Sequence, residues 1–307
     1  MDPVDAIVPK KDSSFAMLLE AKRRDAEIHY FEQRDLRLIN GEAMGRSRRL
    51  DVFDRHDAWF ELGEPRDIRL GELDVILMRK DPPFDMEYVY TTYVLDRAKL
   101  AGALVVNDPQ ALRNINEKAY AAWFPDWTPP TLITRSMAGM KAFLAEHGQI
   151  VVKPLDGMGG RSIFVVRKGD NNANVIFETL TDHGHRFAMA QVYIPEITEG
   201  DKRILLIDGE PVPHALARVP SGDDNRGNIV VGAVARGQPL SQRDASICKQ
   251  VGPALRDAGV LFAGIDVIGD YLTEVNVTSP TGIRELDREF GINIAGLMFD
   301  AMERRIA

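Results

Sequence analysis

A lysine followed by a glycine-rich loop is the first pattern in the sequence that could do chemistry. Lys153 ends an apolar run, and Gly157, Gly159 and Gly160 precede a second apolar run. Glycine lets backbone N–H groups approach phosphate oxygens closely, and a lysine that leaves a strand can neutralise their charge. The segment therefore predicts a nucleoside triphosphate site, although an ordinary glycine-rich hairpin has the same pattern. The sequence has no GxxxxGK[ST] loop and no GxGxxG after its early strands, so we expect another kind of nucleotide site.

Three oxygen-bearing side chains nearer the C-terminus form a second candidate site. Asp266 precedes a turn at Gly269-Asp270, and Glu274 and Asn276 follow it with the spacing that puts side chains on one face of a strand. Oxygen ligands without a nearby His or Cys favour Mg²⁺ bound with phosphates over zinc. A two-residue turn would point Asp266 away from Glu274, so we expect a three-residue turn that aligns them. Polar residues on a solvated strand face are the alternative.

The helices and strands expected in the first 115 residues form the first part of the chain. A helix over 12–24 is expected to start at Asp12 or Ser13, and Asp108-Pro109 has the cap and first-turn proline that open another. The pattern also predicts a strand at 28–31, a hairpin turn at 40–41, a buried strand at 75–78, a helix over 86–102 and a strand at 104–107. We interpret this part as a βαβ domain.

Prolines between Phe124 and Pro130 indicate a linker, after which short strands and glycine loops dominate. This second part is predicted to be α+β, with a polar loop at 220–228. Its expected helices cover 136–147, 241–258 and 285–305, and its expected strands cover 149–153, 162–167, 187–194, 203–207 and both sides of Gly269-Asp270.

Composition narrows the class of protein. The 307 residues carry 38 Lys+Arg and 46 Asp+Glu, a net charge of −8, and an acidic surface makes a nucleic-acid partner unexpected. This length predicts two or three domains. The single cysteine, Cys248, shares a helix face with apolar residues and is expected in the core. Without a leader or an apolar run of about 18 residues, we expect a cytoplasmic protein with no membrane partner.

Longer motifs add a resemblance to a known family. The two lysines Lys118 and Lys153, the glycine loop and the later Asp…Glu-x-Asn set resemble the ATP-grasp superfamily. Nearly the whole chain is similar to bacterial glutathione synthetase, through the segments KKDSSFAMLLEA, INGEA, DVILMRKDPPFD, NEK, KPLDGMGG, GDKR, DGEPVP, RGN and LTEVNVTSPTGIRE. The resemblance implies an α/β plus α+β fold. Its domains would be a βαβ pre-ATP-grasp domain over 1–116, an ATP-grasp lid subdomain over 117–192 and a catalytic subdomain over 193–307.

The resemblance also implies roles for individual residues. Those implied to bind ATP are Lys118, Lys153, Gly157, Gly159, Gly160, Gln191, Val192, Tyr193, Ile194 and, near the ribose, Asp201. Those implied for catalysis, facing the reacting phosphate and acyl group, are Arg203 and Arg218. Those implied near the dipeptide substrate are Arg79, Arg226, Ser279 and Arg284, and those implied to ligate the metal are Asp266, Glu274 and Asn276.

The implied reaction is the ATP-dependent ligation of γ-glutamylcysteine and glycine to glutathione, with ADP and phosphate as the other products. ATP would convert the carboxylate into an acyl phosphate, which the amine of glycine attacks. Mg²⁺, with Mn²⁺ as a possible substitute, is the implied cofactor, and a homotetramer is the implied assembly. Two alternatives stay open: another ATP-grasp ligase that adds glutamate or D-alanine, and a non-catalytic ATP-binding regulatory protein.

Two features depart from the family pattern. Family members carry a short apolar strand before the Met-Asp-Pro segment, whereas this sequence begins at Met1, so we expect a natural start upstream or a destabilised protein. Apolar and β-branched residues at 229–236 stand where the family tends toward consecutive glycines, and they stiffen that stretch. The polar loop 220–228 is still expected to act as a lid that excludes water from the acyl phosphate.

Overall fold

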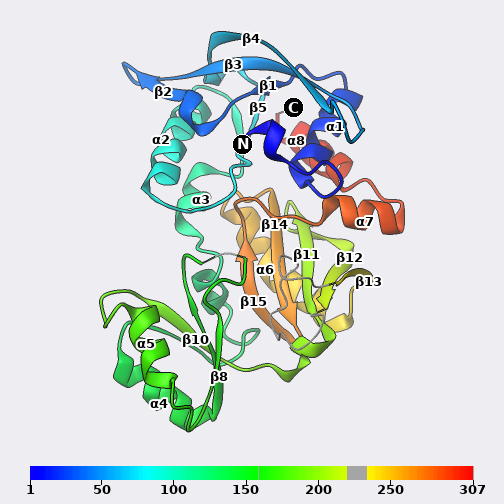
Figure 1. Ribbon diagram of the computed structural model, residues 1–307. Coiled ribbons are helices and arrows are strands. Elements are labelled where there is room, and N and C mark those ends of the chain that lie inside the picture. The colour runs from blue at the N-terminus through cyan, green and yellow to red at the C-terminus, as the bar shows by residue number, and fades with distance from the viewer. Residues whose placement is uncertain (158, 220–233, 307) are drawn as a thin grey trace.

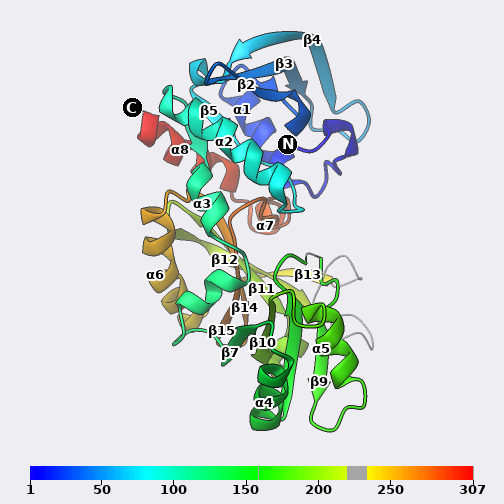
Figure 2. The same cartoon turned by 90° about the vertical axis from the view of Figure 1, so that its left-hand side faces the viewer.

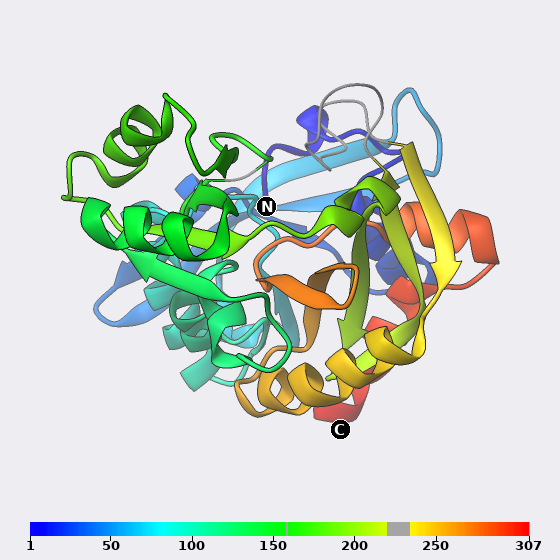
Figure 3. The same cartoon turned by 90° about the horizontal axis from the view of Figure 1, so that it is seen from below.

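The computed structural model describes residues 1–157, 159–219 and 234–306 (Figure 1). Arg226, the expected lid loop and most of the stretch at 229–236 lie outside the described residues. An upper part holds the N-terminal elements, and two lower parts lie side by side beneath it (Figures 1 and 3). Within the described ranges, no helix combines the length and apolarity of a membrane span.

The upper part begins with helix α1 (Ser13–Arg23), which starts where the sequence predicts. The Asp12 carboxylate caps it by accepting a hydrogen bond from the Phe15 N–H (2.7 Å). Asn40 and Gly41 form the predicted turn, with φ values of 51° and 83° that suit a two-residue hairpin. In the antiparallel sheet around this turn, β3 (Glu42–Val52) pairs with β1 (His29–Tyr30), β2 (Leu36–Ile39) and β4 (Phe60–Arg69).

A parallel strand pair completes the upper part. Strand β5 (Val75–Leu77) leads through α2 (Met86–Leu100) to β6 (Leu104–Val106), and Asp108 then caps α3 (Pro109–Asn114). The βαβ interpretation is confirmed for this unit, and the residues before it add a separate antiparallel sheet. There, β1 to β4 are antiparallel neighbours joined without crossover helices. Short 3-10 helices of the chain are η1 (Val4–Ala6), η2 (Gln33–Asp35), η3 (Leu70–Glu72), η4 (Ala119–Trp123) and η5 (Pro195–Glu199).

The first lower part is an antiparallel sheet of order β7-β10-β8-β9. Its elements are β7 (Thr131–Thr134), α4 (Met137–His147), β8 (Gln149–Pro154), β9 (Phe164–Arg167), α5 (Ala173–Thr181) and β10 (Ala188–Val192). Helices α4 and α5 pack on each other and on β8 (Figure 2). Buried side chains such as Met140, Ile150 and Phe177 fill the space between helices and sheet, so this part has its own core.

The second lower part is an antiparallel sheet of order β13-β12-β11-β14-β15. Its elements are β11 (Asp201–Ile207), β12 (Glu210–Val219), β13 (Val234–Pro239), α6 (Gln242–Asp257), β14 (Phe262–Ile268) and β15 (Tyr271–Asn276). Cys248 on α6 is buried with Val251 and Leu255, which confirms the predicted core thiol. Burial raises the pKa of this thiol to about 12.

The closing helix predicted over 285–305 is in fact two helices, α7 (Ile283–Phe290) and α8 (Ile294–Ile306). Helix α7 ends at Gly291, whose φ of 64° is left-handed. Asn293 then stands before α8, and its Oδ1 accepts a hydrogen bond from the Gly296 N–H (2.9 Å). Gly291 ends α7 and Asn293 caps α8, so the chain turns between the two helices. Helical periodicity alone does not predict this break.

Helix α8 returns to the upper part and packs against α1. Met298 of α8 is buried in one cluster with Met17 of α1. At the edge of this contact, Arg24 pairs with Asp300 and Glu303 at 2.6 and 2.7 Å. The N- and C-terminal elements therefore meet in the upper part (Figure 1).

Asn107, directly after β6, ties the upper part to the second lower sheet. Its buried amide donates to the carbonyls of Phe262 and Val277 (both 2.7 Å) and accepts from the N–H groups of Leu261 and Phe262 (both 2.9 Å). We expect Asn107→Ala to lower the free energy of unfolding by about 2–3 kcal/mol, because it strands these buried groups. Urea denaturation followed by circular dichroism measures the change. The exposed Asn171→Ala is the control, and an equal effect of both substitutions contradicts the prediction.

Candidate active site

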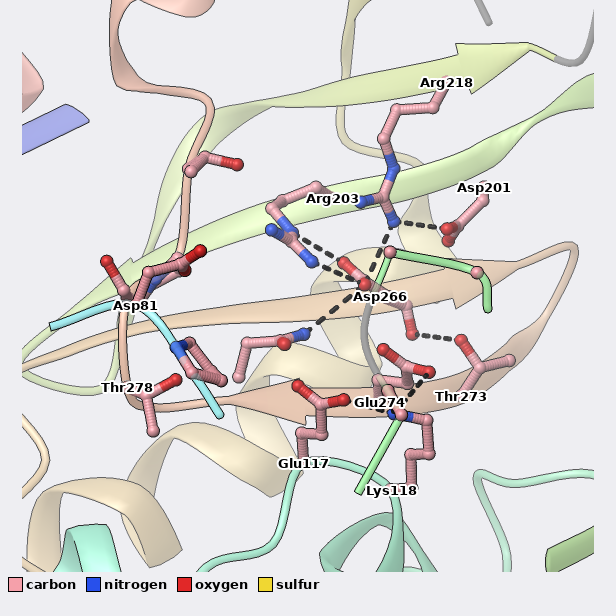
Figure 4. A pocket seen from close by; sticks show the side chains of 18 of the residues that line it. Asp81, Glu117, Lys118, Asp201, Arg203, Arg218, Asp266, Thr273, Glu274 and Thr278 are labelled. Carbon is pink, nitrogen blue, oxygen red and sulfur yellow. Dashed lines mark hydrogen bonds and ion pairs between the residues drawn. The ribbon is translucent and has the colours of Figure 1, made fainter. Parts of the chain in front are cut away.

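A cavity of about 1020 Å³ opens where the upper part and the two lower sheets meet. Side chains from all three parts line it (Figure 4). The predicted site residues that it brings together are Arg79, Lys118, Lys153, Gly157, Gly159, Gly160, Gln191, Val192, Tyr193, Ile194, Asp201, Arg203, Arg218, Asp266, Glu274, Asn276 and Ser279. Arg284 is not among its lining residues; its guanidinium instead pairs with Asp54 at 2.8 Å.

Two buried lysines from different segments lie together in the cavity, Lys153 at the end of β8 and Lys118 directly before η4. The Nζ atoms of Lys118 and Lys153 stand 3.8 and 3.4 Å from Oε1 of Glu274, and Lys118 also donates to the Gly157 carbonyl. Burial disfavours the Lys118 ammonium, but Glu274 and Glu117 outweigh it and raise its pKa. Both cations therefore converge on one carboxylate at the start of the glycine loop.

The glycines of this loop are required by its geometry. A Cβ at Gly157 would stand 2.6 Å from Cγ of Pro154. Gly159 and Gly160 have left-handed φ values of 67° and 72°. The loop thus comes close to the lysines with a backbone that other residues would strain, as a phosphate-binding loop needs.

The β14–β15 hairpin aligns its three oxygen-bearing residues, but not through the turn that the sequence predicted. The turn has two residues, and a β-bulge at Thr273 shifts the register so that Asp266 lies opposite Glu274 and Gly264 opposite Asn276. The expected three-residue turn was therefore wrong, while the expected alignment is confirmed. Thr273 Oγ1 donates to the Asp266 carbonyl (3.1 Å), which holds the bulge.

Asp266 stands at the centre of an ionic network formed across β11, β12 and β14 (Figure 4). Arg203 holds it with a two-pronged contact, Nε to Oδ1 at 2.8 Å and Nη2 to Oδ2 at 2.7 Å. Arg218 Nη2 lies 3.0 Å from the same Oδ2 and also donates to Asp201. Burial opposes ionisation of Asp266, but the two guanidiniums outweigh it and hold its pKa well below the usual range. Burial raises the pKa of Asp201 to about 7.

The donor set fits a magnesium ion that is bound together with phosphates. No group of three or more His, Cys, Asp or Glu side chains in the described part of the chain could hold a metal by itself. Asp266 and Glu274 offer two carboxylates and Asn276 an amide oxygen, from one face of a hairpin. Mg²⁺ is typically held by one or two carboxylates plus substrate phosphates. These residues therefore suit an ion that arrives with a nucleotide.

The predicted adenine segment runs from the end of β10 along the cavity wall. Gln191 is buried, and its Nε2 donates to Thr131 Oγ1 (3.1 Å). The N–H groups of Val192 and Tyr193 donate to carbonyls of Pro130 and Gln149 (3.0 and 3.2 Å). The segment is therefore fixed to the first lower sheet.

Arg79 forms the opposite end of the cavity, in the upper part. It is 7% exposed, and it donates from Nε to Ser14 Oγ and from Nη2 to the Pro280 carbonyl (both 3.0 Å). Its Nη1 is buried without a hydrogen-bond partner. Burial lowers the pKa of this guanidinium to about 10, so the group is still protonated at neutral pH. Arg79 is therefore a buried cation that can bind an anionic group.

Glu117 is a cavity residue that the sequence did not indicate. It precedes Lys118 in the NEK segment, and its carbonyl accepts a hydrogen bond from the Val275 N–H (2.7 Å). Burial and the nearby Glu274 raise the pKa of its carboxyl group. The motif itself was the available signal, because it placed an acidic residue beside a predicted ATP-binding lysine.

Comparison with known proteins decides the family. The family model described as prokaryotic glutathione synthetase, N-terminal domain, matches residues 1–113, and the one described as prokaryotic glutathione synthetase, ATP-grasp domain, matches residues 117–291. The chain belongs to the prokaryotic glutathione synthetase family. Glutathione synthetase of Salmonella typhimurium is 56% identical over 307 residues, covering 100% of this chain and 98% of its own. That of Escherichia coli K12 is 55% identical over 306 residues, covering 100% and 97%.

Solved structures support the fold. An ATP-grasp ligase, PsnB, complexed with its minimal precursor superposes with a TM-score of 0.62 at 18% identity, covering 95% of this chain and 94% of that one. D-alanine–D-alanine ligase from Bacillus anthracis complexed with ATP gives 0.55 at 14% identity, covering 78% and 82%. The glutathione synthetase family, the ATP-grasp fold and the cavity together establish an ATP-dependent ligase, as the sequence predicted.

Proposed function

We propose that this ligase joins γ-glutamylcysteine to glycine in the described cavity, with ATP as the co-substrate. The observation that carries the proposal is that two buried lysines, a glycine loop, an arginine–carboxylate network and a buried Arg79 line one cavity. Full-length identity of 55–56% to glutathione synthetases supports the same substrates. Glutathione, ADP and phosphate are the expected products.

The lysines and the loop are the proposed phosphate-binding groups. Lys118 and Lys153 already converge on Glu274, so phosphates that enter between them replace one anionic partner with another. Gln191, Val192, Tyr193 and Ile194 are proposed to contact the adenine, and Asp201 the ribose. Mg²⁺, or Mn²⁺ in its place, would neutralise phosphate charge next to Asp266, Glu274 and Asn276.

Arg203 and Arg218 are the proposed catalytic residues. A carboxylate oxygen of the dipeptide takes the γ-phosphoryl group from ATP, which releases ADP and leaves an acyl phosphate. The amine of glycine then attacks the acyl carbon, and the tetrahedral intermediate expels phosphate as the amine loses a proton. The two guanidiniums are held in place by Asp266, so they can stabilise the transferring group and the oxyanion without reorganising.

Mass spectrometry of the products tests the proposal. Purified protein with ATP, Mg²⁺, γ-glutamylcysteine and glycine should form glutathione and ADP, and omission of any one component should abolish the tripeptide. Formation of ADP without tripeptide contradicts the assignment. So does equal product formation when glutamate or D-alanine replaces glycine, since those are the substrates of the alternative ligases.

Arg79 and Ser279 are the proposed contacts of the dipeptide in this cavity. Roles for Arg226 and Arg284 are proposed from the family resemblance alone. We expect Arg79→Lys to raise KM for γ-glutamylcysteine by about 10–100-fold, because an ammonium cannot replace the planar guanidinium that Ser14 and the Pro280 carbonyl hold. KM for ATP should stay the same, since Arg79 lies at the other end of the cavity. Steady-state kinetics with each substrate varied in turn measures both constants. A parallel rise of both contradicts the assignment.

We also propose the division into residues 1–116, 117–192 and 193–307 as substrate, lid and catalytic units. We also propose a cytoplasmic location and, from the family resemblance, a homotetramer. Analytical ultracentrifugation measures the assembly directly, and a monomer at micromolar concentration contradicts the tetramer.

A further inference from the structure

Glu117 lies beside the β14–β15 hairpin although it is far from it in the sequence. The hydrogen bond from the Val275 N–H to its carbonyl fixes the backbone of residue 117 next to β15. The preceding residue, Asn116, stiffens the turn, because its Oδ1 accepts from the N–H groups of the two residues after Glu117 at 3.1 and 2.9 Å. The position of the Glu117 backbone therefore does not depend on the charge of its side chain.

The Glu117 carboxylate contacts two groups that the proposed reaction uses. Lys118 Nζ donates to its Oε1 (Figure 4). Its Oε2 stands 3.0 Å from the amide nitrogen of Asn276 when the amide oxygen faces Arg203 Nη2 at 3.2 Å. Glu117, Asn276 and Arg203 then form a continuous line of donors and acceptors.

This line determines which way the Asn276 amide points. A carboxylate only accepts hydrogen bonds and a guanidinium only donates them, whereas an amide does one at each end. In the opposite orientation, the amide oxygen would face the Glu117 carboxylate, and the nitrogen would gain only a 3.4 Å contact with Asp266. Glu117 and Arg203 therefore select the orientation with the amide oxygen away from Glu117.

We propose that Glu117 is a positioning residue that presents the Asn276 amide oxygen, the one atom of this side chain able to ligate a cation. The inference rests on the proposed metal role of Asn276. An amide nitrogen carries its hydrogens toward a ligand and cannot bind a divalent cation, so a rotated amide removes one donor of the set. Loss of a carboxylate that orients a ligand typically weakens metal affinity by about 10–100-fold.

An exchange of the two functional groups tests the inference. Glu117→Gln keeps the shape of the side chain, but the Lys118 ammonium draws the new amide oxygen, so the new NH₂ faces Asn276 and rotates its amide. In Asn276→Asp, the two ends of the new carboxylate are equivalent, so its orientation does not matter. This carboxylate, however, faces that of Glu117. In the double variant E117Q/N276D, the glutamine NH₂ donates to the aspartate, whose other oxygen stays on the Arg203 side.

The readout is binding of Mn²⁺, followed by electron paramagnetic resonance in the presence of a non-hydrolysable ATP analogue. We expect E117Q to weaken Mn²⁺ binding by about 10–100-fold and the double variant to regain most of that loss. Affinity for the analogue without metal should be unchanged, which a purely structural role would not predict. Glu146→Gln, on a side chain that is 73% exposed, is the control.

Each other outcome overturns the inference. Wild-type affinity in E117Q shows that orientation of Asn276 needs no help from Glu117. A double variant that binds Mn²⁺ no better than E117Q shows that the charge of Glu117, and not the direction of the amide, is what matters. Failure of the wild-type protein to bind Mn²⁺ with the analogue rejects the metal site itself, and it is distinguished from the other outcomes because it needs no variant.

Discussion

Glu274→Gln is expected to lower the rate of ligation by about 10²–10³-fold, since it removes one carboxylate from the proposed metal set. The free energy of unfolding should change by less than about 1 kcal/mol. The reason is the setting of Glu274: its side chain is 20% exposed, and its ionic contacts with Lys153 and Lys118 are long, at 3.4 and 3.8 Å. An isosteric amide fits the same space.

Two measurements on the same preparation check this result. The initial rate of glutathione formation at saturating substrates gives the effect on catalysis, and urea denaturation gives the effect on folding. Exposed Glu146→Gln should change neither. A loss of activity that is matched by an equal loss of stability would place Glu274 among the structural residues and not among the metal ligands.

Asp266→Asn is expected to damage both properties. Asp266 is 3% exposed, and both Arg203 and Arg218 lie within 3.0 Å of it. Removal of its charge leaves two buried guanidiniums without this partner, which typically costs about 3–5 kcal/mol. Activity should fall by at least as much as in Glu274→Gln, because the proposed metal ligand and the anchor of both catalytic arginines are lost together. Denaturation and initial-rate measurements test the two parts of the prediction separately.

The pH dependence of this loss has a definite sign. Despite burial, Arg203 and Arg218 hold the pKa of Asp266 well below the usual range, so its ionised form stabilises the folded protein. That contribution is full above the pKa of the unfolded chain, about 4, and is lost as the pH falls toward the folded value. The part of the stability difference between wild type and Asp266→Asn that comes from this carboxylate should therefore shrink below about pH 4. A difference that grows on acidification contradicts the assignment.

The β14–β15 hairpin was predicted from the sequence in its side-chain alignment but not in its turn. Alternation along the strand predicted that Asp266 and Glu274 share a face, and they do. The turn was mispredicted because an odd turn and an even turn followed by a bulge give the same alignment. The pairing of Ile268 with Tyr271, and the bulge that the Thr273 hydrogen bond holds, distinguish them, and both exist only in the folded hairpin.

Contacts between distant segments account for the other differences. The Val275 N–H fixes the backbone of Glu117, and the Asn276 amide contacts its carboxylate. Neither residue is close to Glu117 in the sequence. In the upper part, β4 contains Pro65 and mostly exposed side chains, so it lacks the strong alternation that marks a strand. Capped helices such as α1 were predicted well, because their signals lie within a few residues of each other.

The return of α8 to α1 has a consequence for how this protein is made. On the ribosome, α1 emerges first, but Met17 finds its partner Met298 only after nearly the entire polypeptide has been synthesised. During synthesis, the apolar face of α1 in the upper part therefore stays uncovered until α8 is made. The two lower sheets can form earlier, because each is built from its own segment. Contacts of such sequence separation slow folding and expose the chain to aggregation. Translation speed and chaperone supply should thus affect correct folding of the upper part more than folding of the two lower parts.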